Sequence, residues 1–177
     1  MTAKRARKIK EEEFDQRMID IARVTRVVKG GKKMRFRATL AIGDKKGHVG
    51  IGIAKGLDVA AAVSKAFIKA KKNMIKVPLN KNGSIQHTIY CKFKAAKILL
   101  KPASSGVGVK VGGAVRTILE LAGVQNVTGK ILGASNKINN VKATLIALSS
   151  FKKSKNDKEA VEKNPNEQNI SEIKTEN

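Results

Sequence analysis

Apolar and polar residues alternate near the start of the chain with the two-residue period of β-strands. The alternation covers residues 22–28 and 35–42, and the glycine-bearing segment KGGKKM separates them. A second glycine-flanked reversal, GDKKG at 43–47, leads into HVGIGIA. The pattern therefore predicts a β-hairpin followed by a third strand. The predicted hairpin tip carries Lys29, Lys32 and Lys33.

A helix is predicted next, because Asp58 stands at an N-cap position before residues with helical spacing. The apolar residues of this helix are Val59, Ala62, Val63, Ala66, Phe67, Ala70 and Met74. Lysines recur every three or four residues and form a second stripe: Lys65, Lys69, Lys72 and Lys76. No carboxylate lies four residues from any of these lysines, so we interpret the stripe as a phosphate-binding face rather than a solvated one.

The second half of the chain also combines predicted strands and helices. The segment VPLNKNGS at 77–84 has the composition of a domain boundary, and HTIYCKF and AKILLK after it predict two strands. A helix is predicted to end at Gly123, and a strand is predicted near 124–132. A last helix follows the capping pair SN, with Ile138, Val141, Leu145, Leu148 and Phe151 along one side.

The order of elements, βββα and then ββαβα, predicts an α+β chain of two small domains. The predicted divisions are a flexible basic arm at 1–12, a first domain at 13–76, a linker at 77–84, a second domain at 85–151 and a disordered tail at 152–177.

The net charge of +23 lies on the predicted folded part rather than on a terminal extension. Residues 21–156 contain 28 basic residues and three acidic ones, Asp44, Asp58 and Glu120. Such charge opposes compaction unless an anion neutralises it, so we expect a bound polyanion.

Other composition features favour a cytoplasmic protein without a cofactor. Cys91 is the one cysteine, and His48 and His87 are isolated, so we expect neither an internal disulfide nor a metal site. No apolar run approaches the roughly 20 residues that span a bilayer, and the basic N-terminal residues are not followed by the apolar region of a signal peptide.

The glycine-rich stretch GVGVKVGGAVR at 106–116 resembles loops that bind phosphate before a helix. It lacks the GK[ST] ending of a P-loop, and Glu120, interpreted as a surface residue, is the only carboxylate between residues 77 and 156. We therefore expect no enzyme and no small-molecule substrate, with a metabolite kinase as the weaker alternative. The glycines then indicate positive φ or a close approach to RNA or protein, or chain reversal alone.

Structured RNA is the favoured polyanion. Six aromatic residues are too few for the repeated stacking that single-strand binders use, whereas cations on a hairpin and a helix suit phosphates and shape. A free-standing RNA chaperone, or a nucleoid-type DNA-binding protein, remains the alternative.

Several motifs, in order, resemble one family. They are EFDQRMIDIARVTRVVKGGKKMRFRATLAIGDKKGHVGIGIAKG, KKNMIKVPL, KPASSGVGVKVGGAVRTILELAGVQNV and LGASNKINNVKATLIAL. Over about residues 13–150 the chain is similar to the bacterial small-subunit ribosomal protein family numbered five.

The resemblance implies a first domain like a double-stranded-RNA-binding domain (dsRBD-like) and a second domain with a left-handed βαβ crossover. It also implies a non-catalytic protein that binds 16S rRNA beside ribosomal proteins four and eight, near the messenger RNA entry channel. Roles in assembly of the 30S subunit, decoding accuracy and messenger unwinding follow from the same resemblance.

Charge and resemblance together predict the contact residues. Those predicted to bind rRNA are Arg23, Arg26, Lys29, Gly30, Gly31, Lys32, Lys33, Arg35, Arg37, Lys45, Lys46, His48, Lys55, Lys65, Lys69 and Lys72. Those matching the family's contact with protein four are Ser105, Gly106, Gly108 and Arg116. The chain departs from the family pattern at His48, Lys110, Val111, Lys137 and Asn140.

Overall fold

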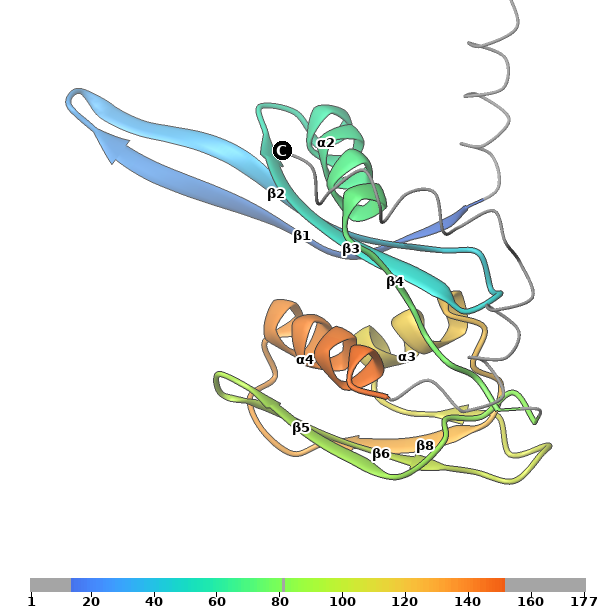
Figure 1. Cartoon of the computed structure of the whole chain (residues 1–177). Helices are drawn as coiled ribbons and strands as arrows, with labels where there is room; N and C mark the ends of the chain where they lie inside the picture. The colour runs from blue at the N-terminus through green and yellow to red at the C-terminus, as the bar shows by residue number, and fades with distance from the viewer. Residues whose placement is uncertain (1–13, 81, 152–177) are drawn as a thin grey trace, which may run out of the picture.

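Two four-stranded sheets, with helices on one or both of their faces, organise the chain (Figure 1). This computed structural model describes residues 14–80 and 82–151. The predicted N-terminal arm and C-terminal tail lie outside these residues.

The first sheet is antiparallel, in the order β1-β2-β3-β4. Its elements are β1 (Asp15–Val28), β2 (Gly31–Gly43), β3 (His48–Gly56), α2 (Val59–Lys72) and β4 (Met74–Lys76). Asp58 caps α2, and its side chain accepts a hydrogen bond from the Val59 N–H at 2.7 Å. Helix α2 buries Ala62, Ala66 and Ala70 against the sheet, as the apolar stripe predicts.

The second sheet has the order β5-β6-β8-β7. Its elements are β5 (Ile89–Phe93), β6 (Ala96–Pro102), β7 (Val109–Lys110), α3 (Gly113–Leu121), β8 (Val127–Ile131) and α4 (Lys137–Ser149). The predicted cap of α4 is confirmed, because the Asn136 side chain accepts from the Ile138 N–H at 3.1 Å. Strands β7 and β8 pair in parallel with α3 between them, so the two-domain α+β architecture contains the expected βαβ unit.

Four predicted details are wrong. The hairpin turn is only Lys29–Gly30, and Lys32 and Lys33 lie in the strand ladder rather than in the reversal. Strand β1 begins at Asp15 rather than near residue 22. A bulge between Met18 and Asp20 interrupts the alternation in its first part.

The third error concerns the end of α2. The helix stops at the C-cap residue Asn73, so Met74 and Lys76 belong to β4 and the lysine stripe on α2 ends at Lys72. The short strands β4 and β7 were also absent from the predicted element order, because stretches of two or three residues show no period.

The first sheet is buried on both faces where the two units meet. Leu40 and Ile42 of β2 pack in the cluster under α2, whereas Ala41 packs with Ile51 in the cluster that α3 and α4 share. Figure 1 shows α3 and α4 between the two sheets. Val77, the first residue of the predicted linker, and Ile85, which follows its last residue, are both buried in this shared cluster. The domain boundary at 77–84 stays a prediction.

Backbone atoms of the two units contact one another at the β2–β3 turn. The Lys45 N–H donates to the Leu121 carbonyl and the Gly47 N–H to the Ala122 carbonyl, both at 3.0 Å. A Cβ atom at Gly43 would overlap the Leu121 carbonyl, and one at Gly123 would overlap the Lys45 carbonyl. Glycine is therefore required at both positions for this approach.

Candidate nucleic-acid interface

One face of the β1–β2 hairpin is cationic over most of its length. Residues 33, 35 and 37 of β2 lie on the face opposite the residues that pack under α2, because side chains alternate along a strand. The register places Arg26 opposite Lys33, and Lys55 of β3 opposite Arg37. The structure thus brings together Arg26, Lys33, Arg35, Arg37 and Lys55, which we call the hairpin face.

The other predicted hairpin cations lie on the reverse side or at the tip. Arg23 pairs with Phe36, whose ring packs toward α2, and Lys32 shares that side by alternation. Lys29 is exposed at the tip, and Gly30 adopts a φ of 87° that closes the two-residue turn. The β1–β2 hairpin, which reaches beyond α2 in Figure 1, therefore presents cations on both of its sides.

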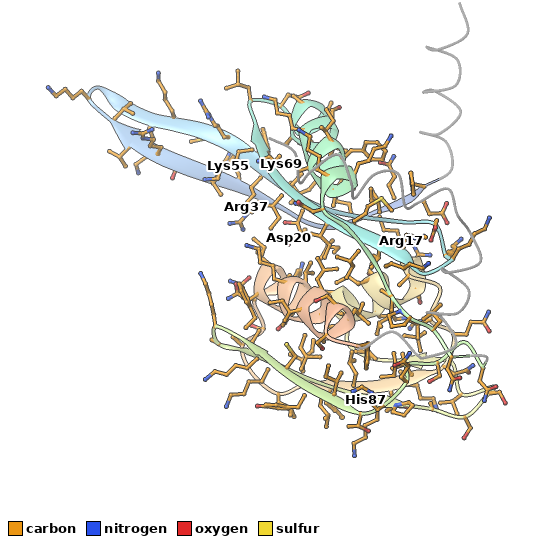
Figure 2. The ribbon with its side chains drawn as sticks, viewed as in Figure 1. Arg17, Asp20, Arg37, Lys55, Lys69 and His87 are labelled. Atoms are coloured by element: carbon orange, nitrogen blue, oxygen red, sulfur yellow. The ribbon has the colours of Figure 1, made fainter. Side chains whose placement is uncertain are left out.

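The base of the hairpin face carries a partly neutralised cluster. Arg37 Nη2 lies 4.0 Å from Asp20 Oδ2, and Lys137 Nζ donates to Asp20 Oδ1 at 3.0 Å. Figure 2 shows Arg37 beside Asp20 on the side of the hairpin that faces α4. The buried Arg37 Nε has no hydrogen-bond partner among the described residues.

The cations of the β2–β3 turn lie at the far end of the sheet. Lys45 Nζ is ion-paired with Asp15, and its backbone is held against α3. His48 Nδ1 lies 2.6 Å from Asp44 Oδ2. Burial disfavours the charged Asp44 carboxylate, but hydrogen bonds from the backbone N–H groups of His48 and Lys46, together with the contact to the His48 side chain, outweigh it and lower the pKa of this group. The structure does not bring Lys45, Lys46 and His48 to the hairpin face.

The lysines of α2 form a separate group. Lys65, Lys69 and Lys72 are exposed, as is Lys71, which the stripe omitted. Lys69 and Lys142 of α4 line an open groove with Ile51 and Ile53 at the edge of β3. Of the three α2 lysines predicted to bind rRNA, Lys69 is therefore the one that lines this groove between the two units.

The glycine-rich loop of the second unit is shaped by positive φ and held by one buried side chain. Gly106 and Gly108 have φ of 88° and 76°, and no atom lies within 4 Å of a Cβ at either position. The Gly108 N–H donates to Asn126 Oδ1 at 3.2 Å, and Asn126 Nδ2 donates to the Asn82 carbonyl at 3.0 Å. Asn126 was missed from the sequence, where a single asparagine after a helix carries no signal of this role.

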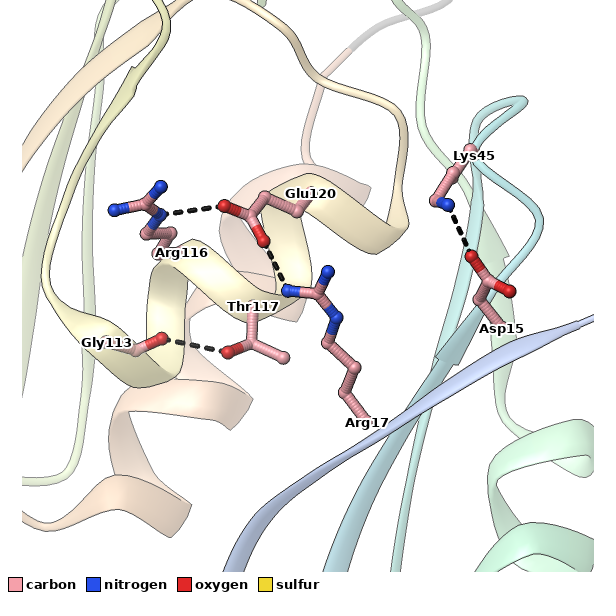
Figure 3. A network of polar contacts seen from close by, with 7 residues as sticks. All are labelled: Asp15, Arg17, Lys45, Gly113, Arg116, Thr117 and Glu120. Atoms are coloured by element: carbon pink, nitrogen blue, oxygen red, sulfur yellow. Dashed lines mark hydrogen bonds and ion pairs between the residues drawn. The ribbon is translucent and has the colours of Figure 1, made fainter.

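Ser105 and Arg116 lie on either side of these glycines. Ser105 is exposed in the loop, and Arg116 lies on α3. Arg116 Nε donates to Glu120 Oε1 at 2.7 Å, and Arg17 of β1 donates to the other oxygen of the same carboxylate (Figure 3). Arg116, and then Arg17, hold the pKa of Glu120 below its ordinary value against the opposing effect of burial. Glu120 thus connects the two units.

The described residues give little support for a metal site, a thiol nucleophile or a membrane span. No group of three or more His, Cys, Asp or Glu side chains in residues 14–80 and 82–151 lies close enough to hold a metal ion. Burial raises the pKa of the Cys91 thiol, which opposes its activation as a nucleophile. Within the same ranges, no helix has the length and apolar content to cross a membrane.

Comparisons with known proteins agree over both units. Residues 14–78 match the family model described as ribosomal protein S5, N-terminal domain, and residues 91–161 match ribosomal protein S5, C-terminal domain.

Curated relatives are about half identical to the chain over the aligned residues, which make up 78% of this chain or more. The small ribosomal subunit protein uS5 of Gloeobacter violaceus is 52% identical over 139 residues, which are 78% of this chain and 62% of that protein. The uS5c protein of Cyanidioschyzon merolae is 51% identical over 79% of this chain and 92% of its own length. The uS5c protein of Spinacia oleracea is 48% identical over 78% of this chain, which spans only 45% of that longer protein. Since both family models match in order and the identity is this high, the chain belongs to the ribosomal protein S5 family.

Proposed function

We propose that this chain is a structural constituent of the small ribosomal subunit and that it binds 16S rRNA through the β1–β2 hairpin. The observation that carries the proposal is the hairpin face, where five cations project from one side of adjacent strands. Phosphates are the partner that such a face suits, because guanidinium and ammonium groups bind them without reading sequence.

The finer roles belong to the same proposal. Ser105, Gly106, Gly108 and Arg116 form a contact with ribosomal protein four, and a further contact is made with protein eight. The chain lies near the messenger RNA entry channel, supports assembly of the 30S subunit, and contributes to decoding accuracy and messenger unwinding. It acts in the cytoplasm as part of the ribosome. Family membership and the exposure of the glycine-rich loop support these roles.

The salt dependence of RNA binding tests the hairpin contact. We expect the variant with Arg26, Lys33 and Arg35 of the hairpin face all replaced by Ala to lower the slope of log K against log salt by roughly two to three, since each phosphate contact contributes about 0.7–0.9. The probe is 16S rRNA transcribed in vitro, and the full-length chain is used.

A charge-matched control separates local contact from a general loss of charge. The control replaces Lys71, Lys94 and Lys142 by Ala; these are exposed lysines that lie away from the hairpin. A slope that stays unchanged in the hairpin variant, or that falls equally in both variants, would exclude the hairpin as the contact.

Sedimentation tests membership of the subunit independently. We expect the chain to travel with small subunits in a sucrose gradient of cell extract. Recovery chiefly in the light fractions would instead support a free-standing RNA chaperone.

A further inference from the structure

The second sheet has one face that no other described element covers. Its inward residues, such as Ile98 and Leu100 of β6 and Val127 of β8, are buried with α3 and α4. Figure 1 shows these helices on one side of the sheet only. Alternation and register place the following side chains on the opposite side, which we call the outer face: Tyr90, Lys92, Lys97, Leu99, Lys101, Lys110, Thr128 and Lys130.

The charge on the outer face has one sign. Lys92 lies directly opposite Lys97 across β5 and β6, an arrangement of like charges that destabilises a sheet. Lys101 and Lys110 both lie opposite Thr128, on the two sides of β8. The four strands contain no Asp or Glu, so nothing within the sheet offsets these lysines. A polyanion outside the protein would offset them.

An aromatic and an aliphatic side chain lie among the lysines. Leu99 has Tyr90 opposite it on one side and Lys130 on the other. Tyr90 is 56% exposed, whereas each of the five phenylalanines is buried or half-buried. Among the tyrosine and phenylalanine rings, Tyr90 is therefore the one that is free to stack on a ligand. A ring flanked by cations suits an unpaired base with its neighbouring phosphates.

We propose that the outer face of the second sheet is a second RNA-binding surface, which takes a single-stranded segment of rRNA with phosphates on the lysines and a base on Tyr90. The proposal rests on the proposed rRNA-binding function but concerns a surface separated from the hairpin by α3 and α4. A duplex fits less well, because its bases are stacked inside and would leave Tyr90 and Leu99 unused.

The first experiment removes charge from the outer face. In the full-length chain, Lys92→Gln, Lys97→Gln and Lys130→Gln are combined, and binding to transcribed 16S rRNA is measured over a range of salt concentrations. We expect the salt slope to fall by about two, because single-stranded contacts contribute about 0.7 each. The matched control is Lys71→Gln, Lys94→Gln and Lys142→Gln, which should leave the slope unchanged.

The hairpin variant measured in parallel distinguishes the two proposals. If the hairpin variant lowers the slope and the outer-face variant does not, the proposed function stands and this inference is overturned. If the outer-face variant lowers the slope and the hairpin variant does not, the inference stands and the hairpin is not the contact.

The second experiment tests the stacking contact without changing charge. We expect Tyr90→Thr to weaken binding of a short oligouridine by about tenfold, and Tyr90→Phe to bind within about twofold of the unmodified chain. A short RNA duplex should be insensitive to both changes. Equal binding of oligouridine by Tyr90→Thr and the unmodified chain would overturn the stacking contact.

An acidic peptide is the competing occupant, and the chain supplies one in residues 157–177, which have six acidic and three basic residues. A synthetic peptide of this sequence should not displace oligouridine. Two results together would assign the outer face to a protein segment instead. The peptide would bind the unmodified chain but not the outer-face lysine variant, and oligouridine would not compete with it.

Discussion

At the residue scale, Gly43 and Gly123 determine how closely the two units can approach. Their missing side chains allow the backbone bonds from Lys45 to Leu121 and from Gly47 to Ala122. Gly123 also has a φ of 82°, so two separate requirements coincide at one position. Gly106 has a similar φ of 88° but open space where a Cβ would lie.

This contrast gives a matched pair of substitutions. Gly106→Ala should lower the free energy of unfolding by about 1 kcal/mol, the cost of a left-handed backbone for a residue with a Cβ. Gly123→Ala should cost about 2–4 kcal/mol, because overlap with the Lys45 carbonyl adds to the same backbone cost. Urea denaturation of both variants measures the difference. Equal costs would mean that a Cβ at position 123 is accommodated without cost, and that glycine is not required there for the approach of the two units.

At the element scale, Asn126 connects three segments that the sequence separates. Its side chain bonds the backbone of Gly108 and of Asn82, and its carbonyl accepts from Ser84 Oγ at 2.7 Å. The glycine-rich loop is thereby held beside β8, where the Val127 N–H donates to the Gly108 carbonyl at 3.1 Å. A buried amide with both of its ends bonded can hold a loop in one conformation.

Two replacements of Asn126 separate its acceptor from its donor. Asn126→Ala should lower the free energy of unfolding by about 1–3 kcal/mol and speed hydrogen exchange at the Gly108 amide. Asn126→Asp keeps an acceptor for the Gly108 N–H but loses the donor to Asn82. It should therefore protect Gly108 better than the alanine variant does. Unchanged exchange at Gly108 in Asn126→Ala would show that the loop does not depend on this side chain.

The elements that could be predicted are those with local causes. Asp58 and Asn136 cap their helices from adjacent positions, and the buried alanines of α2 recur at helical spacing, so residue order alone indicates them. The start of β1 could not be predicted, because the bulge after Met18 shifts the alternation. The pairing of β7 with β8 depends on a contact across α3 that no local pattern shows.

At the scale of the whole molecule, the few carboxylates are used within the protein. The described residues contain five: Asp15, Asp20, Asp44, Asp58 and Glu120. Asp58 caps α2, Asp44 closes the β2–β3 turn, and the other three pair with cations of the chain. The outer face is therefore left without internal neutralisation, and the hairpin face is neutralised only at its base, where Arg37 lies beside Asp20, so both surfaces are available to an external polyanion.

Pairs between the units could not be foreseen from the sequence. Arg17 and Glu120 are 103 positions apart, and Asp20 and Lys137 are 117 apart. The count of charged residues placed the positive charge correctly on the folded part, but it could not show which cations pair with the few carboxylates. Lys137, a departure from the family pattern, turns out to join the two units through Asp20.

The Glu120 contact makes the stability of the whole molecule depend on pH in a defined direction. Arg116 and Arg17 lower the pKa of Glu120 in the folded chain below its ordinary value of 4.5. The unfolded chain therefore takes up a proton first as pH falls, so the stabilisation is fully present above about pH 4.5 and is lost below it. We expect it to be small, about 0.2–1 kcal/mol, because both arginine side chains are more than half exposed.

Comparison with Glu120→Gln isolates this contribution. The difference in unfolding free energy between the unmodified chain and Glu120→Gln should be constant from pH 7 to pH 6, and it should shrink as pH falls below about 4.5. Arg17→Gln serves as the control for the contact between units, because it leaves the Arg116 bond within α3 in place and should remove only part of the difference. A difference that is the same at pH 7 and at pH 3 would mean that the Glu120 carboxylate does not hold the two units together.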